Sequence, residues 1–261
     1  MSTCLLKTNN LMDSVRGVTQ IELKVDGKNR IVTILGELHN HGFKCSKGKN
    51  ISMYDYCVER EANNKNCMFM LEYNSKEKHM DRIGSEIIRE VFSGSSNKVR
   101  SKCIGVDTRQ EYITRDQQSV LYNEEISYSQ IYTPNVELTK KHYIDPYTNT
   151  GLSKINNSDF NTEMALYRNE IETEFYNLNK KSKISQLDLK WVWCKVMDYD
   201  VLNEIIKKGS ADEYVVVLGE NHRNNITRQL EKWNSVKILK NESGKNQHDC
   251  VKTKELSTAC V

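Results

Sequence analysis

The chain has 261 residues, 38% of them hydrophobic, and is long enough to bury a sizeable core as one domain over residues 1–241. Its 38 Lys and Arg residues nearly balance 35 Asp and Glu residues, so the formal charge of +3 gives no electrostatic reason to expect nucleic acid or an anionic membrane as a partner. No apolar run is long enough for a signal peptide or a membrane span, and the eight cysteines include no Cys-x-x-Cys pair, which favours a cytoplasmic protein with reduced thiols.

The first third of the chain alternates strand patterns with helix patterns. Residues 20–25 and 30–35 flank Asp26-Gly27-Lys28-Asn29, which predicts a hairpin whose second, nearly all apolar strand is buried. The elements expected next are a helix over 53–62, a strand over 67–71, a helix that follows Ser75 and ends at Gly94, and a strand over 102–106. This alternation predicts an α/β fold with a mostly parallel central sheet flanked by helices.

The middle of the chain loses this regularity. Residues 112–157 are polar, rich in Tyr and Asn, and contain both prolines, so they suggest either a disordered or strand-containing insertion or a lid that carries tyrosines. Two helices follow, one with an apolar stripe from Phe160 to Leu178 and one that begins with a capping-box pattern at Ser185. We therefore expect a helical and loop insertion over about 112–210.

The last part of the chain returns to the α/β pattern. Residues 214–218 predict a buried strand, followed by a short helix through Ile226 and Leu230 and a last strand over 236–239. Residues 242–261 are polar, and we expect them to form a flexible tail.

Two strand ends carry the same short motif. The predicted strand over 30–35 leads into Gly36-Glu37-Leu38-His39, and the strand over 214–218 leads into Gly219-Glu220-Asn221-His222. Ligands of open parallel sheets bind at the carboxyl ends of the strands, so we expect the two motifs to end neighbouring strands and to share one site. Glycine permits a sharp exit and a close approach of backbone, glutamate supplies a carboxylate, and histidine can act as a base, an acid or a metal ligand.

Further polar residues follow other predicted strands. Glu72 comes directly after the strand over 67–71, and Asp107 follows the strand over 102–106, with Arg109 two residues later. Each alone is consistent with a solvated strand cap, but together with the two motifs they indicate a functional site at one edge of the sheet. His41 is either a further site residue or a residue of a solvent-facing loop.

The order of these motifs resembles the superfamily that joins erythromycin esterases, the haem-uptake protein ChaN and the TraB/Tiki proteins. Its members have an early and a late strand-ending Gly-x-x-His motif, matched here by Gly36 to His39 and Gly219 to His222, and an acidic residue that ends the intervening strand, matched by Glu72. Gly105-Val106-Asp107 resembles a strand end of the esterase branch. The resemblance covers about residues 30–109 and 214–233 and implies a fold with duplicated halves and a polar pocket between them.

Within that superfamily, Tiki-type members are metal-dependent peptidases, erythromycin esterases open a lactone with an activated water, and ChaN-like members bind haem. The first hypothesis is therefore a hydrolase that cleaves an ester or amide bond in a small-molecule or peptide substrate. The hydrolysis would proceed either with or without the help of a metal ion. His39 or His222 would take a proton from water, and Glu37 or Glu72 would orient the imidazole or act as the base. The expected substrate-binding residues are Asp107, Arg109, Glu220 and His41, with Arg109 holding an anionic group.

Metal and cofactor expectations differ between the hypotheses. If a divalent metal is bound, His39, His222 and Glu72 are the expected ligands, although the chain has no His-Glu-x-x-His helix. A nucleophilic serine is not indicated, because no Gly-x-Ser-x-Gly motif is present. The alternatives are a ChaN-like protein that binds haem or another small ligand through His or Tyr of the insertion, and a catalytically inactive interaction module whose partner binds residues 112–157.

Overall fold

The computed structural model forms two compact units. The sheet unit comprises Met1–Val106 and Lys207–Val261, and the helical unit comprises Asp107–Ile206, which covers most of the expected insertion. The residues that the structure describes are 3–5, 11–38, 50–75, 85–93, 98–121, 132–133, 135–209, 211–244, 251–252 and 256–259.

The sheet unit is built on a six-stranded sheet in the described part of the chain. Across the sheet the strands are β7 (Cys103–Gly105), β6 (Cys67–Leu71), β8 (Glu213–Gly219), β4 (Lys28–Glu37), β3 (Val15–Val25) and β9 (Val236–Ser243). The strands from β7 to β4 are parallel, whereas β3 pairs antiparallel with both β4 and β9. The predicted α/β fold with a mostly parallel central sheet flanked by helices is confirmed, and a duplication into halves stays a prediction.

The β3–β4 hairpin sets the register of the sheet. Its turn places Asp26 at φ 51° and Gly27 at φ 75°, two left-handed positions in succession that suit Asp-Gly and match the twist of the strands. Val25 therefore pairs with Lys28, and further along the hairpin Gly17 pairs with Gly36. The predicted hairpin is confirmed, and both strands are longer than the sequence pattern indicates, since β3 begins at Val15 and β4 extends to Glu37.

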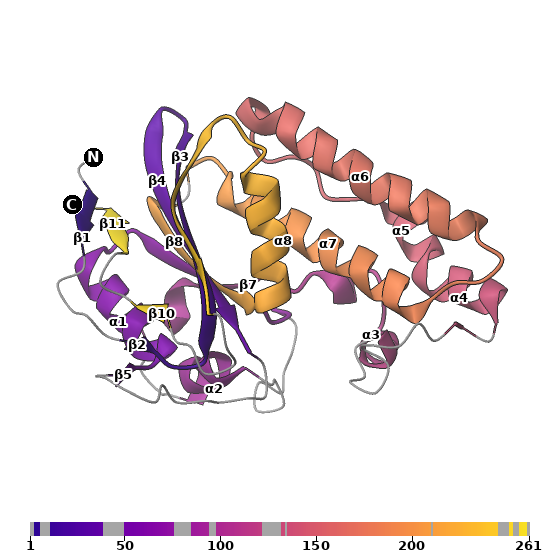
Figure 1. The fold of residues 1–261 in the computed structure, drawn as a ribbon, viewed down its shortest axis with the longest axis horizontal. Coiled ribbons are helices and arrows are strands. Elements are labelled where there is room, and N and C mark those ends of the chain that lie inside the picture. The colour runs from indigo at the N-terminus through magenta and orange to yellow at the C-terminus, as the bar shows by residue number, and fades with distance from the viewer. Residues whose placement is uncertain are drawn as a thin grey trace. The chain divides into compact units, whose positions relative to one another are not determined.

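Helices cover both faces of this sheet (Figure 1). One face packs on α1 (Met53–Asn63) and α2 (Glu86–Ser93), and its buried strand residues include Leu35, Phe69 and Val217. The other face carries α8 (Glu220–Leu230), which follows β8 without a loop. Only the last part of the helix expected after Ser75 lies within the described residues, and there Ile87 and Val91 are buried as the spacing predicts.

Short strands, all but one of them near the two ends of the sequence, form two small sheets. One pairs β1 (Thr3–Leu5) with β11 (Ser257–Ala259), and the other joins β10 (Val251–Lys252), β2 (Leu11–Met12) and β5 (Asn50–Ile51). Val251 and Leu256 are 1% and 0% exposed. The described residues after Asn241 thus form strands and reach the core where we expect a polar tail, because two isolated apolar residues are too few to produce a visible pattern.

The helical unit contains more helix than the sequence indicates. Its elements are the 3-10 turns η3 (Arg109–Glu111) and η4 (Ser158–Phe160) and the helices α3 (Arg115–Leu121), α4 (Val136–Tyr143), α5 (Asp145–Thr150), α6 (Asn161–Lys180) and α7 (Gln186–Ile205). The expectation of a disordered or strand-containing segment over 112–157 is wrong where α3, α4 and α5 form. Thr139 is the only buried residue of α4, and Pro146 occupies the first turn of α5, where proline is tolerated, so neither helix shows the usual apolar period.

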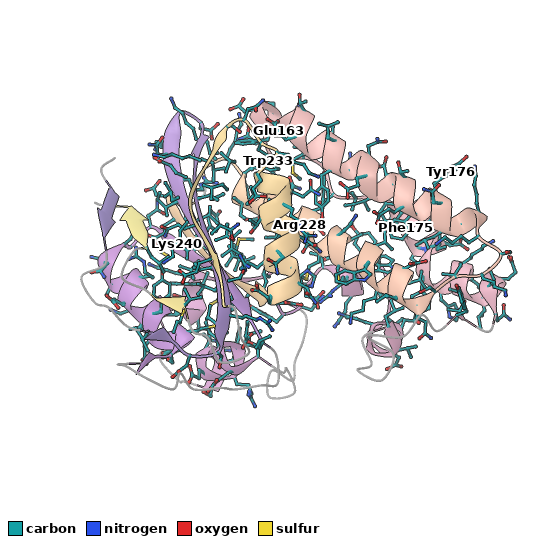
Figure 2. All side chains as sticks on the ribbon, viewed as in Figure 1. Glu163, Phe175, Tyr176, Arg228, Trp233 and Lys240 are labelled. Carbon is teal, nitrogen blue, oxygen red and sulfur yellow. The ribbon has the colours of Figure 1, made fainter. Side chains whose placement is uncertain are left out.

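The two long helices form as predicted. Phe175 is 1% exposed and its neighbour Tyr176 is 59% exposed, so the apolar stripe of α6 faces inward and the polar side faces solvent (Figure 2). Ser185 caps α7 by accepting hydrogen bonds from the backbone N–H groups of Leu187 and Asp188. No helix in the described part of the chain is both long enough and apolar enough to cross a membrane.

Candidate active site at the carboxyl edge of the sheet

The two motif-bearing strands are neighbours. β4 and β8 run parallel, and the last residue of β4, Glu37, pairs with the last residue of β8, Gly219. The prediction that the two motifs end neighbouring strands is therefore confirmed. His39 and His41 lie outside the described residues.

Gly36 and Glu37 face opposite sides of the sheet because side chains alternate along a strand. Gly36 lies under α8, where an added Cβ would be 1.8 Å from Glu220 Oε2. Glu37 is 3% exposed and accepts a hydrogen bond of 3.1 Å from the backbone N–H of Glu86, the first residue of α2. Glu37 thus lies on the face covered by α2, and α8 covers the other face.

Glu72 and His222 meet at the strand ends on the α8 side. His222 lies in the first turn of α8, and its Nε2 is 3.5 Å from Glu72 Oε1. The second carboxylate oxygen, Oε2, accepts a 2.7 Å hydrogen bond from the backbone N–H of Gly219, where β8 passes into α8. The His222 and Glu72 side chains are 8% and 11% exposed. The structure therefore brings together two of the four predicted catalytic residues, in a largely buried setting that strengthens their electrostatic interaction.

Glu220, predicted to bind substrate, is engaged by Arg223 one turn later. Arg223 Nε donates to Glu220 Oε2 at 2.8 Å, and Arg223 Nη2 donates to Oε1 at 2.7 Å. Such a two-point contact fixes both side chains in one geometry. In this structure the Glu220 carboxylate helps to hold α8 on the sheet.

Asp107 and Arg109 belong to the helical unit and pair with each other. Arg109 Nε and Nη2 donate to the two oxygens of Asp107 at 2.7 and 2.9 Å, and Gln118 Nε2 donates to Asp107 Oδ2 at 3.0 Å. Asp107 and Arg109 are 9% and 4% exposed. The guanidinium that we expected to hold an anionic group is thus already bound to a carboxylate of its own chain.

Tyr73, next to Glu72, is fixed where β6 ends. Burial raises the pKa of Tyr73 to about 12, so its phenol stays protonated at neutral pH. The backbone of β7 approaches closely, since an added Cβ at Gly105 would lie 2.6 Å from the Tyr73 carbonyl oxygen. Tyr73 packs in the hydrophobic core cluster with residues of α1 and α2.

The sequence reasoning missed Arg223 and Gly17, which contact each other. An added Cβ at Gly17 would lie 2.5 Å from Arg223 Nε. A lone glycine inside a strand often marks a close approach of another group, but Gly17 lies outside the strand predicted over 20–25 and falls within β3 only because that strand begins at Val15. Arg223 carried no signal, because a charged residue in a polar helix is expected at the surface.

No group of three or more His, Cys, Asp or Glu side chains within the described residues is placed to hold a metal ion. Of the three predicted metal ligands, Glu72 and His222 lie together, and His39 falls outside the part of the chain that the structure describes.

Comparisons of this chain with protein-family models, with curated proteins and with solved structures found no match.

Proposed function

We propose that the protein is a hydrolase that cleaves an ester or amide bond in a small-molecule or peptide substrate, with His222 as the general base and Glu72 as its carboxylate partner. The observation that supports this proposal is the contact between His222 Nε2 and Glu72 Oε1 at 3.5 Å, at the carboxyl edge of a mostly parallel sheet. Ionisable groups at that edge commonly mark the functional site of an α/β protein.

The proposed chemistry begins with water. His222 takes a proton from a water molecule as the oxygen attacks the carbonyl carbon of the substrate, and later returns the proton to the leaving group. The carboxylate of Glu72 stabilises the positive charge that the imidazole acquires in between, as the carboxylate of a catalytic triad does. The backbone N–H of Gly219 holds Glu72 in place for this role.

The remaining predicted residues have different places in this proposal. Glu37 supports α2 on the opposite face of the sheet, so Glu72 is the carboxylate that orients His222. A divalent metal held by His39, His222 and Glu72 would supply an activated water when bound.

We also propose that the enzyme is cytoplasmic. The cysteines whose state the structure describes, namely Cys57, Cys67, Cys103 and Cys194, are free thiols, which is consistent with a reducing compartment.

The test is hydrolysis of ester and peptide libraries by the full chain and by two variants, Glu72→Gln and His222→Gln. Glutamine at 72 keeps an oxygen that can accept the Gly219 N–H but removes the charge beside His222. We expect kcat/KM to fall by about 100- to 10,000-fold in each variant, the range typical for loss of general-base catalysis. Arg228→Gln, at an exposed residue in the last turn of the same helix, serves as the control and should stay within threefold of the wild type (Figure 2).

Two results would contradict the proposal. One is hydrolysis that persists in folded Glu72→Gln and His222→Gln proteins at the wild-type rate. The other is the absence of turnover on every ester and peptide together with a Soret band after reconstitution with haem, which would favour a haem-binding protein instead.

A further inference from the structure

Arg223 is a fully buried arginine that crosses from α8 to the sheet. It is 0% exposed, and its guanidinium is surrounded by acceptors from three elements. Besides Glu220, the contacts of Arg223 are with Thr19 Oγ1 at 2.7 Å, Asn241 Oδ1 at 3.2 Å, Ser243 Oγ at 2.5 Å and Asn224 Oδ1 at 2.8 Å. Because a buried charge is tolerated only when it is paired and hydrogen-bonded, this set of contacts holds Arg223 in one place.

The sheet is shaped to receive this ion pair. Gly17 of β3 and Gly36 of β4 are directly opposite each other in the hairpin register. Added Cβ atoms there would lie 2.5 Å from Arg223 Nε and 1.8 Å from Glu220 Oε2. The two glycines therefore open a space that the Glu220 and Arg223 side chains fill, and the glycine of the first motif accommodates the glutamate of the second.

Helix geometry connects the ion pair to His222. Successive residues of an α-helix are about 100° apart, so Glu220 and Arg223 lie on one side of α8 and His222 lies between them in sequence on another side. A side chain extends about 5 to 6 Å from the helix axis, so a rotation of about 20° would move the His222 ring by roughly 2 Å. Such a rotation would break a contact of 3.5 Å between His222 and Glu72.

We infer that Glu220 and Arg223 are positioning residues, which fix the rotation of α8 on the sheet so that His222 faces Glu72. This inference rests on the proposed function for its effect on turnover, whereas its geometric part, the placement of the His222 ring, can be measured without any substrate. Misplacement of a catalytic group by about 1 Å can lower a rate by about 100-fold, so the ion pair matters for catalysis although it does not touch the reacting atoms.

The main variant is the double substitution Glu220→Gln/Arg223→Gln, which removes both charges together and leaves no lone buried charge. The first readout is the Cε1–Hε1 NMR signal of the His222 ring at one fixed pH, assigned by its loss in His222→Gln. Glu72→Gln defines where this signal lies when the carboxylate is lost. We expect the double variant to move the signal toward that position, and Arg228→Gln, in the last turn of α8, to leave it unchanged.

The second readout is the division of the effect between kcat and KM. We expect the double variant to lower kcat at least tenfold with KM within twofold, because the substrate still binds while the base is misplaced. A folded double variant with an unchanged His222 signal would overturn the inference. If the double variant does not fold, Ser243→Ala decides the question, since it removes one Arg223 contact at an exposed residue: a smaller movement in the same direction supports the inference, and no movement overturns it.

The two failures are distinguishable. A wild-type protein that hydrolyses nothing contradicts the proposed function, while the NMR signal still decides whether the ion pair places the His222 ring.

Discussion

Arg60 and Glu213 form an ion pair with no exposed side-chain surface at the opposite end of β8 from the candidate site. Arg60 Nε and Nη2 donate to the two carboxylate oxygens at 2.8 and 2.7 Å, and Asn64 Nδ2 donates to Oε2 at 3.1 Å. We predict that Glu213→Gln destabilises the protein by about 3–5 kcal/mol, because it leaves the Arg60 charge buried without its partner. Urea unfolding measures this, and the double variant Arg60→Met/Glu213→Leu should lose less than Glu213→Gln alone.

The space at Gly36 gives a second stability prediction. Gly36→Ala would place a methyl group where the Glu220 carboxylate lies. We expect the free energy of unfolding to fall by about 1–3 kcal/mol, because α8 and β4 must shift apart. The check is a double-mutant cycle with Glu220→Ala in urea unfolding. If Gly36 makes room for Glu220, the Ala substitution at 36 should be nearly harmless once the Glu220 side chain is gone, and a full cost in both backgrounds would contradict this reading.

Asp200 in the helical unit gives a prediction about pH. Burial raises the pKa of the Asp200 carboxyl, and hydrogen bonds from Ser153 and Thr108 lower it by a smaller amount. A carboxyl whose pKa is higher in the folded than in the unfolded protein favours folding at low pH, and this contribution is lost as the pH rises through the folded-state pKa. Asp200→Asn should therefore be closest to the wild type near pH 4 and gain stability relative to it toward pH 7.

Unfolding free energies between pH 4 and pH 7 measure this difference. Ser158→Ala, at an exposed residue of η4 that carries no titratable group, is the control and should show a constant difference from the wild type. A constant difference for Asp200→Asn as well would show that Asp200 titrates alike in the folded and unfolded protein.

The cap of α7 gives a local prediction. Ser185 Oγ accepts from two backbone N–H groups that have no partner within the helix. Ser185→Ala should lower the free energy of unfolding by about 1 kcal/mol, and Ser185→Asp, which retains an acceptor, should restore most of it. If both variants lowered the free energy of unfolding by the same amount, the loss would not come from the helix cap.

Much of the fold could be predicted from residue patterns. The apolar runs of β4, β6 and β8 and the polar residues that follow them indicated parallel strands that end at one edge, because apolar runs of that length must be buried on both faces. Because these strands end at the same edge, Glu72 and His222, which follow two of them, could be expected to meet there. The sequence could also have indicated which carboxylate lies beside His222. Gly36 and Glu37 are adjacent in a strand and must face opposite sides, so a Gly36 that faces α8 leaves Glu37 on the other face and Glu72 as the partner of His222.

Other features depend on packing that no local pattern reveals. The helices α4 and α5 are short, and in such helices stability comes from tertiary contacts, as in the stacking of Tyr147 on Phe175 with ring centres 3.8 Å apart. The burial of Arg223 depends on Thr19, Asn241 and Ser243, which are distant in sequence. A charged residue becomes a core residue only when those acceptors converge on it.

The tight turn at Asp26 and Gly27 has a consequence at the far end of the hairpin. β4 has ten residues, so the turn and Glu37 are roughly 30 Å apart at about 3.3 Å per residue. An extra residue in the turn that slid β4 by one position would exchange the faces of all its side chains. A carboxylate would then point at the Glu220 and Arg223 side chains, and α2 would lose its acceptor. The identity of the residues that meet at the edge of the sheet is thus decided by the length of a loop that never approaches it.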